Sequence, residues 1–141
     1  MSKRSREDGC NPFGALLVDA SGALIVEAMN ASNIDRTAHA EMRALRFAAG
    51  EPARLRGATL FSSAEPCAMC AGGAYWAGVA RVVYALSETK LLSLTGSHPE
   101  NPTLSLPCRE VFSRGQRPVK VAGPMLEDEA AQVHSGFWTH A

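Results

Sequence analysis

Two short stretches of the sequence place one imidazole, one carboxylate and two thiols where they can gather around a metal ion. The first is Thr37-Ala38-His39-Ala40-Glu41, and the second is Glu65-Pro66-Cys67-Ala68-Met69-Cys70. Cys67 and Cys70 stand three residues apart, so one helical turn brings both sulfur atoms to the same side. Helix N-termini favour anions, which suits thiolates at the start of a helix. We expect Pro66 to be the first helical residue, where its missing N–H costs nothing.

His39, Cys67 and Cys70 make three protein ligands, one fewer than a closed tetrahedral zinc site contains. A catalytic zinc keeps the fourth position for water or substrate, whereas a structural zinc fills it with protein. The remaining cysteines and histidines lie in segments that we predict to be loops or surface, and none is a convincing fourth ligand: Cys10, His98, Cys108, His134 and His140. The pattern favours a catalytic zinc, with a structural zinc as the alternative.

A His-x-Glu element followed by Pro-Cys-x-x-Cys resembles the cytidine-deaminase-like superfamily of zinc-dependent nucleoside and nucleobase deaminases. The resemblance extends from about Asn11 to Arg81. It implies a three-layer α/β/α sandwich around a mixed five-stranded sheet, with Zn²⁺ held by the three ligands. It also implies hydrolysis of a C–N bond in a small heterocyclic base, release of ammonia, and assembly as a homodimer.

Glu41 follows the predicted histidine ligand by two residues, about 200° further round a helix. It does not share the ligand's face, but in a first helical turn its long side chain can still reach the metal. Zinc lowers the pKa of bound water from 15.7 to about 7. Deamination then needs a group that takes the proton of this water and delivers protons to the ring and to the leaving ammonia. The resemblance gives this catalytic role to Glu41.

The resemblance also implies contacts with the base. An asparagine just before the His-x-Glu element bonds the base in such enzymes, which matches Asn30, with Asn33 as the alternative. Phe13, at the entry to the first predicted strand, matches an apolar wall of the pocket, although simple core packing explains it nearly as well. The backbone around Ala40 is expected to contact the base too.

Two tryptophans complete the expected substrate contacts. Trp76 lies in a Tyr-Trp-Ala sequence after the cysteines, a feature of small zinc guanine deaminases. Trp138 lies near the C-terminus, next to Phe137, which continues the apolar stripe of a predicted C-terminal helix. Since neighbouring residues on a helix point about 100° apart, Trp138 points away from the apolar stripe that contains Phe137. It either packs on a groove or a dimer partner, or, as the resemblance to guanine deaminases implies, belongs to a segment that closes over the active site.

Two subfamilies compete for the substrate. Bacterial tRNA adenosine deaminases share Ala-His-Ala-Glu and Glu-Pro-Cys-x-Met-Cys-Ala-Gly with this chain, while guanine deaminases share Asn-Pro-Phe-Gly-Ala and Tyr-Trp-Ala. Lys plus Arg and Asp plus Glu both number 14, whereas binding tRNA through its phosphates favours a basic excess. We expect guanine or a related purine, with tRNA adenosine as the alternative. Pterin, cytosine and triazine rings stay open, as does an inactive partner subunit with a structural zinc.

The 141 residues suit a single domain, residues 1–141, with one core. No apolar run is long enough to span a membrane and no export signal is evident, so we expect a cytoplasmic protein with free thiols at Cys10 and Cys108. The N-terminal helix of the family is expected to be short or absent, with residues 2–9 frayed.

Strands are predicted to alternate with helices. Expected strands cover residues 13–19, 23–29, 58–63, 80–86 and 119–122. Expected helices cover 39–49, 66–74, 88–94, 107–114 and a stretch from 127 onward that carries Leu126, Ala130, Val133 and Phe137 on one stripe. Gly72 and Gly73 lie within the cysteine-bearing helix. Each costs roughly 1 kcal/mol there relative to alanine, so we expect both to allow close packing against the His39 helix.

Overall fold

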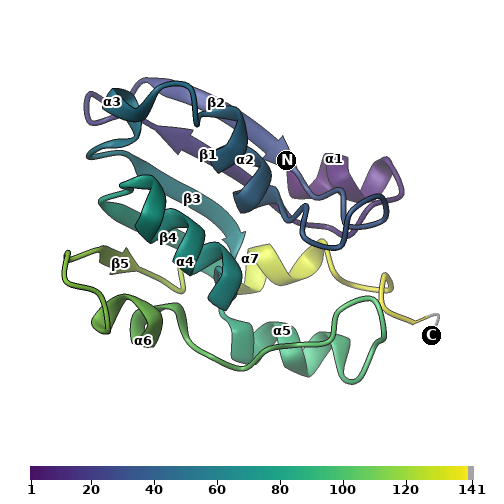
Figure 1. Ribbon diagram of the computed structural model, residues 1–141. Coiled ribbons are helices and arrows are strands. Elements are labelled where there is room, and N and C mark those ends of the chain that lie inside the picture. The colour runs from purple at the N-terminus through teal and green to yellow at the C-terminus, as the bar shows by residue number, and fades with distance from the viewer. Residues whose placement is uncertain (140–141) are drawn as a thin grey trace.

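The computed structural model describes residues 1–139 and contains one five-stranded sheet (Figure 1). Its strand order is β2-β1-β3-β4-β5. Strand β1 is antiparallel to both β2 and β3, while β3, β4 and β5 are parallel. The strands are β1 (Gly14–Val18), β2 (Leu24–Met29), β3 (Thr59–Ala64), β4 (Arg81–Leu86) and β5 (Lys120–Ala122). The predicted mixed α/β sheet is confirmed.

Helices lie on both faces of the sheet. On one face, α2 packs on β1 and β2 and against α4, and α4 packs against α6, while α1 and α7 lie against the other face (Figure 1). The helices are α1 (Ser2–Glu7), α2 (Ala40–Phe47), α3 (Pro52–Leu55), α4 (Ala68–Ala77), α5 (Glu88–Thr95), α6 (Cys108–Ser113) and α7 (Glu127–Gln132). Within residues 1–139, no helix combines the length and hydropathy needed to cross a bilayer.

The main core lies between the sheet and the α2–α4 layer. Strand side chains that alternate toward this layer are fully buried, among them Leu17, Leu60 and Val82. The facing helices present small residues such as Ala44 and Ala74, so their backbones come close to the sheet. The two helices also pack against each other, and their N-terminal ends carry the site described below.

The two glycines of α4 differ in their surroundings. A Cβ on Gly73 would lie 2.7 Å from Sδ of Met42 and 3.3 Å from Cδ1 of Leu45, both on α2. A Cβ on Gly72 would meet nothing within 4 Å. The expected close packing against the His39 helix is therefore confirmed for Gly73 and wrong for Gly72, because that position faces open space.

The two ends of the chain correct the sequence predictions. Residues 2–7 form helix α1, short as expected, but not frayed: Ser5 is fully buried and donates to the carbonyl of Asn11. The predicted C-terminal helix stops at Gln132. Leu126 is 75% exposed with a positive φ, so it is not part of an apolar stripe. Beyond α7 the chain turns, and His140 lies outside the described residues.

Candidate active site

The N-termini of helices α2 and α4 converge on one point and bring the three predicted metal ligands with them. His39 is the N-cap residue of α2 and Cys67 is the N-cap residue of α4, both with extended backbones. Pro66 therefore precedes the cap and is not the first helical residue, because the extended backbone of Cys67 delays the start of the helix by two positions. Cys70 lies one turn into α4 and is fully buried.

The spacing of the ligand atoms fits zinc. Nδ1 of His39 lies 3.6 Å from Sγ of Cys67 and 3.6 Å from Sγ of Cys70, and the three atoms all lie within 4.8 Å of one another. With Zn–N of about 2.05 Å and Zn–S of about 2.3 Å, two corners of a zinc tetrahedron are about 3.6 Å apart. The donor set of one imidazole and two thiols, placed at the corners of such a tetrahedron, makes a potential zinc site.

Glu41 lies beside this cluster in the first turn of α2. Its side chain is buried, and its Oε1 accepts a hydrogen bond from the hydroxyl of Ser62 over 2.8 Å. Its Oε2 accepts from Sγ of Cys70 over 3.7 Å. The side chain of Glu41 thus extends from the first turn of α2 to the ligand cluster.

The site perturbs its own ionisable groups. The hydrogen bond from Cys70 lowers the pKa of Cys67 to about 4, while the same contact and burial raise the pKa of Cys70. The hydrogen bond with Cys67 raises the pKa of His39. Burial raises the pKa of Glu41. A carboxyl group with a raised pKa takes up and returns protons more readily near neutral pH, as a general acid–base requires.

A cavity of about 310 Å³ opens onto the cluster. Its wall combines apolar side chains with a few polar groups, which is typical of small-molecule sites. It is lined by Asn11, Phe13, Asn30, Ser32, Arg36, His39, Glu41, Ala64, Glu65, Cys67, Met69, Glu88, Leu91 and residues 100–104. The last group belongs to the loop after α5, which has no regular secondary structure.

Of the two candidate asparagines, Asn30 lines the cavity. It is 4% exposed, and its Oδ1 accepts from the backbone N–H and the hydroxyl of Ser32 over 2.9 and 2.7 Å. These bonds fix the side chain and leave its amide N–H groups for a ligand. Asn33 instead lies against Cys10, outside the cavity lining.

Phe13 and Ala40 differ in their relation to the cavity. Phe13 lines the cavity and contributes an apolar wall. Ala40 is fully buried at the first position of α2, next to His39, and is not among the residues that line the cavity.

The two tryptophans do not line the cavity. Trp76 is 86% exposed, because it lies six residues after Cys70 on α4 and so about 240° round the helix from that ligand. Trp138 is buried and packs against Phe13, with ring centroids 6.2 Å apart. The predicted direct contacts of Trp76 and Trp138 with substrate are therefore wrong for the single chain. Phe137, which we expected in the core, is less buried than its neighbour Trp138.

Besides Glu100 in the loop after α5, two carboxylates that line the cavity had no role assigned from the sequence, Glu65 and Glu88. Glu65 is buried, and its oxygens accept from the backbone N–H groups of Glu88 and Cys108, each over 3.0 Å. Glu88 begins α5 directly after β4 and lines the cavity. The available signal was topological: ligands of parallel sheets bind at the carboxyl ends of the strands, and both residues lie at such an end.

Known proteins resemble this chain in sequence. A family model described as the cytidine and deoxycytidylate deaminase zinc-binding region matches residues 1–86. A probable cytosine deaminase of Schizosaccharomyces pombe is 38% identical over 139 residues, which cover 98% of this chain and 86% of that protein. A tRNA-specific adenosine deaminase of Haemophilus influenzae is 42% identical over 83 residues, covering 56% of this chain and only 48% of that protein.

The fold has a solved counterpart as well. A structure of guanine deaminase from Nitrosomonas europaea superposes with a TM-score of 0.76 at 26% identity, covering 94% of this chain and 76% of that one. Similarity thus extends to proteins named for three different substrates.

Proposed function

The chain belongs to the cytidine and deoxycytidylate deaminase zinc-binding family and is a zinc-dependent hydrolytic deaminase, and we propose that its substrate is a free nucleobase, guanine or a related purine first. The observation that carries the proposal is the buried Glu41 carboxylate beside three zinc-type ligands at the end of a small cavity. The cavity provides an apolar wall at Phe13 and a fixed amide at Asn30, which suit a flat ring with polar edges.

The reaction replaces a ring C–NH₂ group by C=O, consumes one water and releases ammonia. Zinc, when bound to His39, Cys67 and Cys70, supplies the Lewis acidity that makes water nucleophilic near neutral pH. Glu41 takes the proton of the attacking water, gives a proton to the ring nitrogen beside the reacting carbon, and delivers another to the leaving amine. Ser62 holds the carboxylate for this work through its bond to Oε1.

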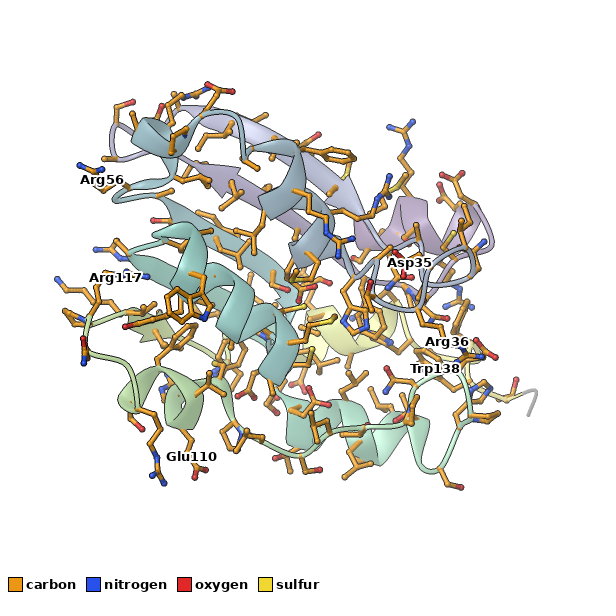
Figure 2. All side chains as sticks on the ribbon, in the orientation of Figure 1. Asp35, Arg36, Arg56, Glu110, Arg117 and Trp138 are labelled. Atoms are coloured by element: carbon orange, nitrogen blue, oxygen red, sulfur yellow. The ribbon has the colours of Figure 1, made fainter. Side chains whose placement is uncertain are left out.

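Small-molecule chemistry is favoured over tRNA by charge. The formal net charge is zero, whereas a nucleic-acid surface is expected to be basic. Arg36 lines the cavity, but Arg56 and Arg117 lie at the opposite end of the molecule (Figure 2). We propose that the enzyme acts as a homodimer in the cytoplasm and that residues 1–141 form one domain. The exposed Trp76 suits a dimer contact.

Cytosine is the second candidate substrate, because the similarity to a probable cytosine deaminase covers nearly the whole chain. Deamination of tRNA adenosine is the third. An inactive partner subunit is disfavoured by the intact, buried Glu41.

Ammonia release from a panel of free bases, with inosine formation in a tRNA anticodon stem-loop measured in parallel, tests the proposal. We expect the purified zinc protein to deaminate a free base with a higher kcat/KM than the stem-loop. Faster inosine formation than any free-base reaction, with steep salt dependence, would instead identify a tRNA enzyme.

A further inference from the structure

We propose that Glu88 selects the substrate ring by accepting a hydrogen bond from a ring N–H that flanks the reacting carbon. This inference rests on the proposed function and narrows it to bases of the 2-aminopyrimidin-4-one type. In that type, which includes guanine and isocytosine, the reacting carbon lies between two ring nitrogens, one of which carries hydrogen.

The backbone of Glu88 is fixed from two sides. Its own N–H donates to Oε2 of Glu65 over 3.0 Å. The preceding residue, Ser87, caps α5 through its hydroxyl and donates its backbone N–H to Oε1 of Glu127 over 3.0 Å. A side chain that starts from such a fixed point can be placed with the precision that recognition of one hydrogen atom needs.

The carboxylate of Glu88 faces the cavity and has no hydrogen bond or ion pair within residues 1–139. It is half-buried, and its electrostatic neighbours, Cys67 first and then Glu65 and Glu41, are all groups of this site. A desolvated carboxylate without a partner is costly, so a ligand that offers an N–H donor there gains binding that one without it does not.

The sheet order places Glu88 and Glu41 on opposite sides of the metal ligands. Glu41 comes from α2, which packs on β1 and β2, whereas Glu88 follows β4. Cys67 follows β3, which lies between β1 and β4 in the sheet. Figure 1 accordingly shows α2 and α5 on either side of the N-terminal end of α4.

When a base turns its reacting carbon toward the metal ligands, the ring atom on one side of that carbon faces Glu41 and the ring atom on the other side faces Glu88. Glu41 needs a ring nitrogen that can be protonated. Glu88 needs a donor on the other flank, which guanine and isocytosine supply as N–H. Cytosine has a C–H at that position and leaves the carboxylate unpaired.

Isocytosine and cytosine form a matched test pair. They are isomers of one size, and deamination converts both to uracil and ammonia, so product release is the same for the two. We expect wild-type enzyme to favour isocytosine in kcat/KM by at least about 100-fold, as a site built around a substrate N–H discriminates strongly against an analogue that lacks it.

Variants then assign the preference to Glu88. Glu88→Ala should lower kcat/KM for isocytosine by at least about 30-fold and change that for cytosine by less than about threefold, because only isocytosine loses a bond. Glu88→Gln, which keeps an acceptor oxygen, should have a kcat/KM for isocytosine between those of the wild type and of Glu88→Ala. The backbone bond to Glu65 stays in both. Glu110→Ala, at an exposed site on α6, is the control and should leave the ratio unchanged.

Zinc content and the thermal midpoint of each variant are measured first, and Glu88→Gln decides the result if Glu88→Ala does not fold. An unchanged isocytosine-to-cytosine ratio in folded, zinc-loaded variants would overturn the assignment of Glu88, and so would a wild-type preference for cytosine. Failure of the wild type to release ammonia from any base would instead contradict the proposed function itself.

Discussion

Ser62 on β3 donates its hydroxyl hydrogen bond to Oε1 of Glu41 on α2 over 2.8 Å, and both side chains are buried. The bond joins a strand of the sheet to the carboxylate proposed for proton transfer. Because it favours the ionised carboxylate, it lowers the pKa of Glu41 against the larger opposing effect of burial.

Replacing Ser62 by alanine should therefore raise the pKa of Glu41 further and move the acid limb of the kcat/KM profile to higher pH. The carboxylate must be ionised to take the proton of water, so activity is then lost at a higher pH than in wild type. At neutral pH we expect a loss of roughly fivefold, as for one bond worth about 1 kcal/mol. Ser63→Ala is the control, since Ser63 accepts from the N–H of Gly14 and not from the site. Equal profiles for both variants would contradict the role of Ser62.

Metal analysis should find about one zinc per chain, and Cys70→Ala should lose it. Removing one of three protein ligands weakens the metal site directly. Cys108→Ala is the matched control, because Cys108 is also a fully buried thiol but lies outside the ligand cluster. Elemental analysis after dialysis distinguishes the two, and loss of zinc from Cys108→Ala alone would refute the ligand assignment.

The adjacent glycines of α4 should respond to alanine in different ways. Gly72→Ala meets nothing within 4 Å and should stabilise the protein by up to about 1 kcal/mol through helix propensity. Gly73→Ala forces a methyl group against Met42 of α2 and should leave the protein about 1–3 kcal/mol less stable than Gly72→Ala. Chemical denaturation measures both, and equal stabilities would argue against tight α2–α4 packing at Gly73.

His134 should make stability depend on pH. Its Nδ1 accepts from Nε1 of Trp138 over 3.1 Å, and burial, with a smaller effect from Arg6, lowers its pKa to about 4. The unfolded chain, with a histidine pKa near 6.5, binds the proton more readily, so stability is full above about pH 6.5 and falls as the pH drops toward 4. The slope approaches about 1.4 kcal/mol per pH unit. His134→Gln should flatten it, and an unchanged slope would assign the effect elsewhere.

Local chemistry explains why the metal cluster was predictable. The residues of each motif, His39 with Glu41 and Cys67 with Cys70, lie at the start of one helix. Their spacing along the chain is therefore fixed by helix geometry and can be recognised in the sequence. The positions of strands and helices were predictable because the periodicity of apolar residues is also local to each segment. Pro66 was misplaced by two positions because the extended N-cap conformation of Cys67 is set by the site and not by the proline.

Features that depend on distant contacts were not predictable. Trp138 is buried because the chain turns after α7 and packs it against Phe13, more than 120 residues earlier in the sequence. Glu88 has no motif around it, and its place at the cavity follows only from the neighbouring positions of β3 and β4. Sequence spacing carries no information on such pairs.

The most direct test of the account is the activity of Glu41→Gln on the best free-base substrate, measured beside its zinc content. The substitution keeps the size of the side chain and all three ligands but removes the group that carries protons. We predict about one zinc per chain, an unchanged thermal midpoint and a loss of turnover of about 10²–10⁴-fold, the usual contribution of general acid–base catalysis. Glu110→Gln, at an exposed position, should retain full activity. Turnover of zinc-loaded Glu41→Gln within about tenfold of wild type would contradict the mechanism, because another group would then carry the protons.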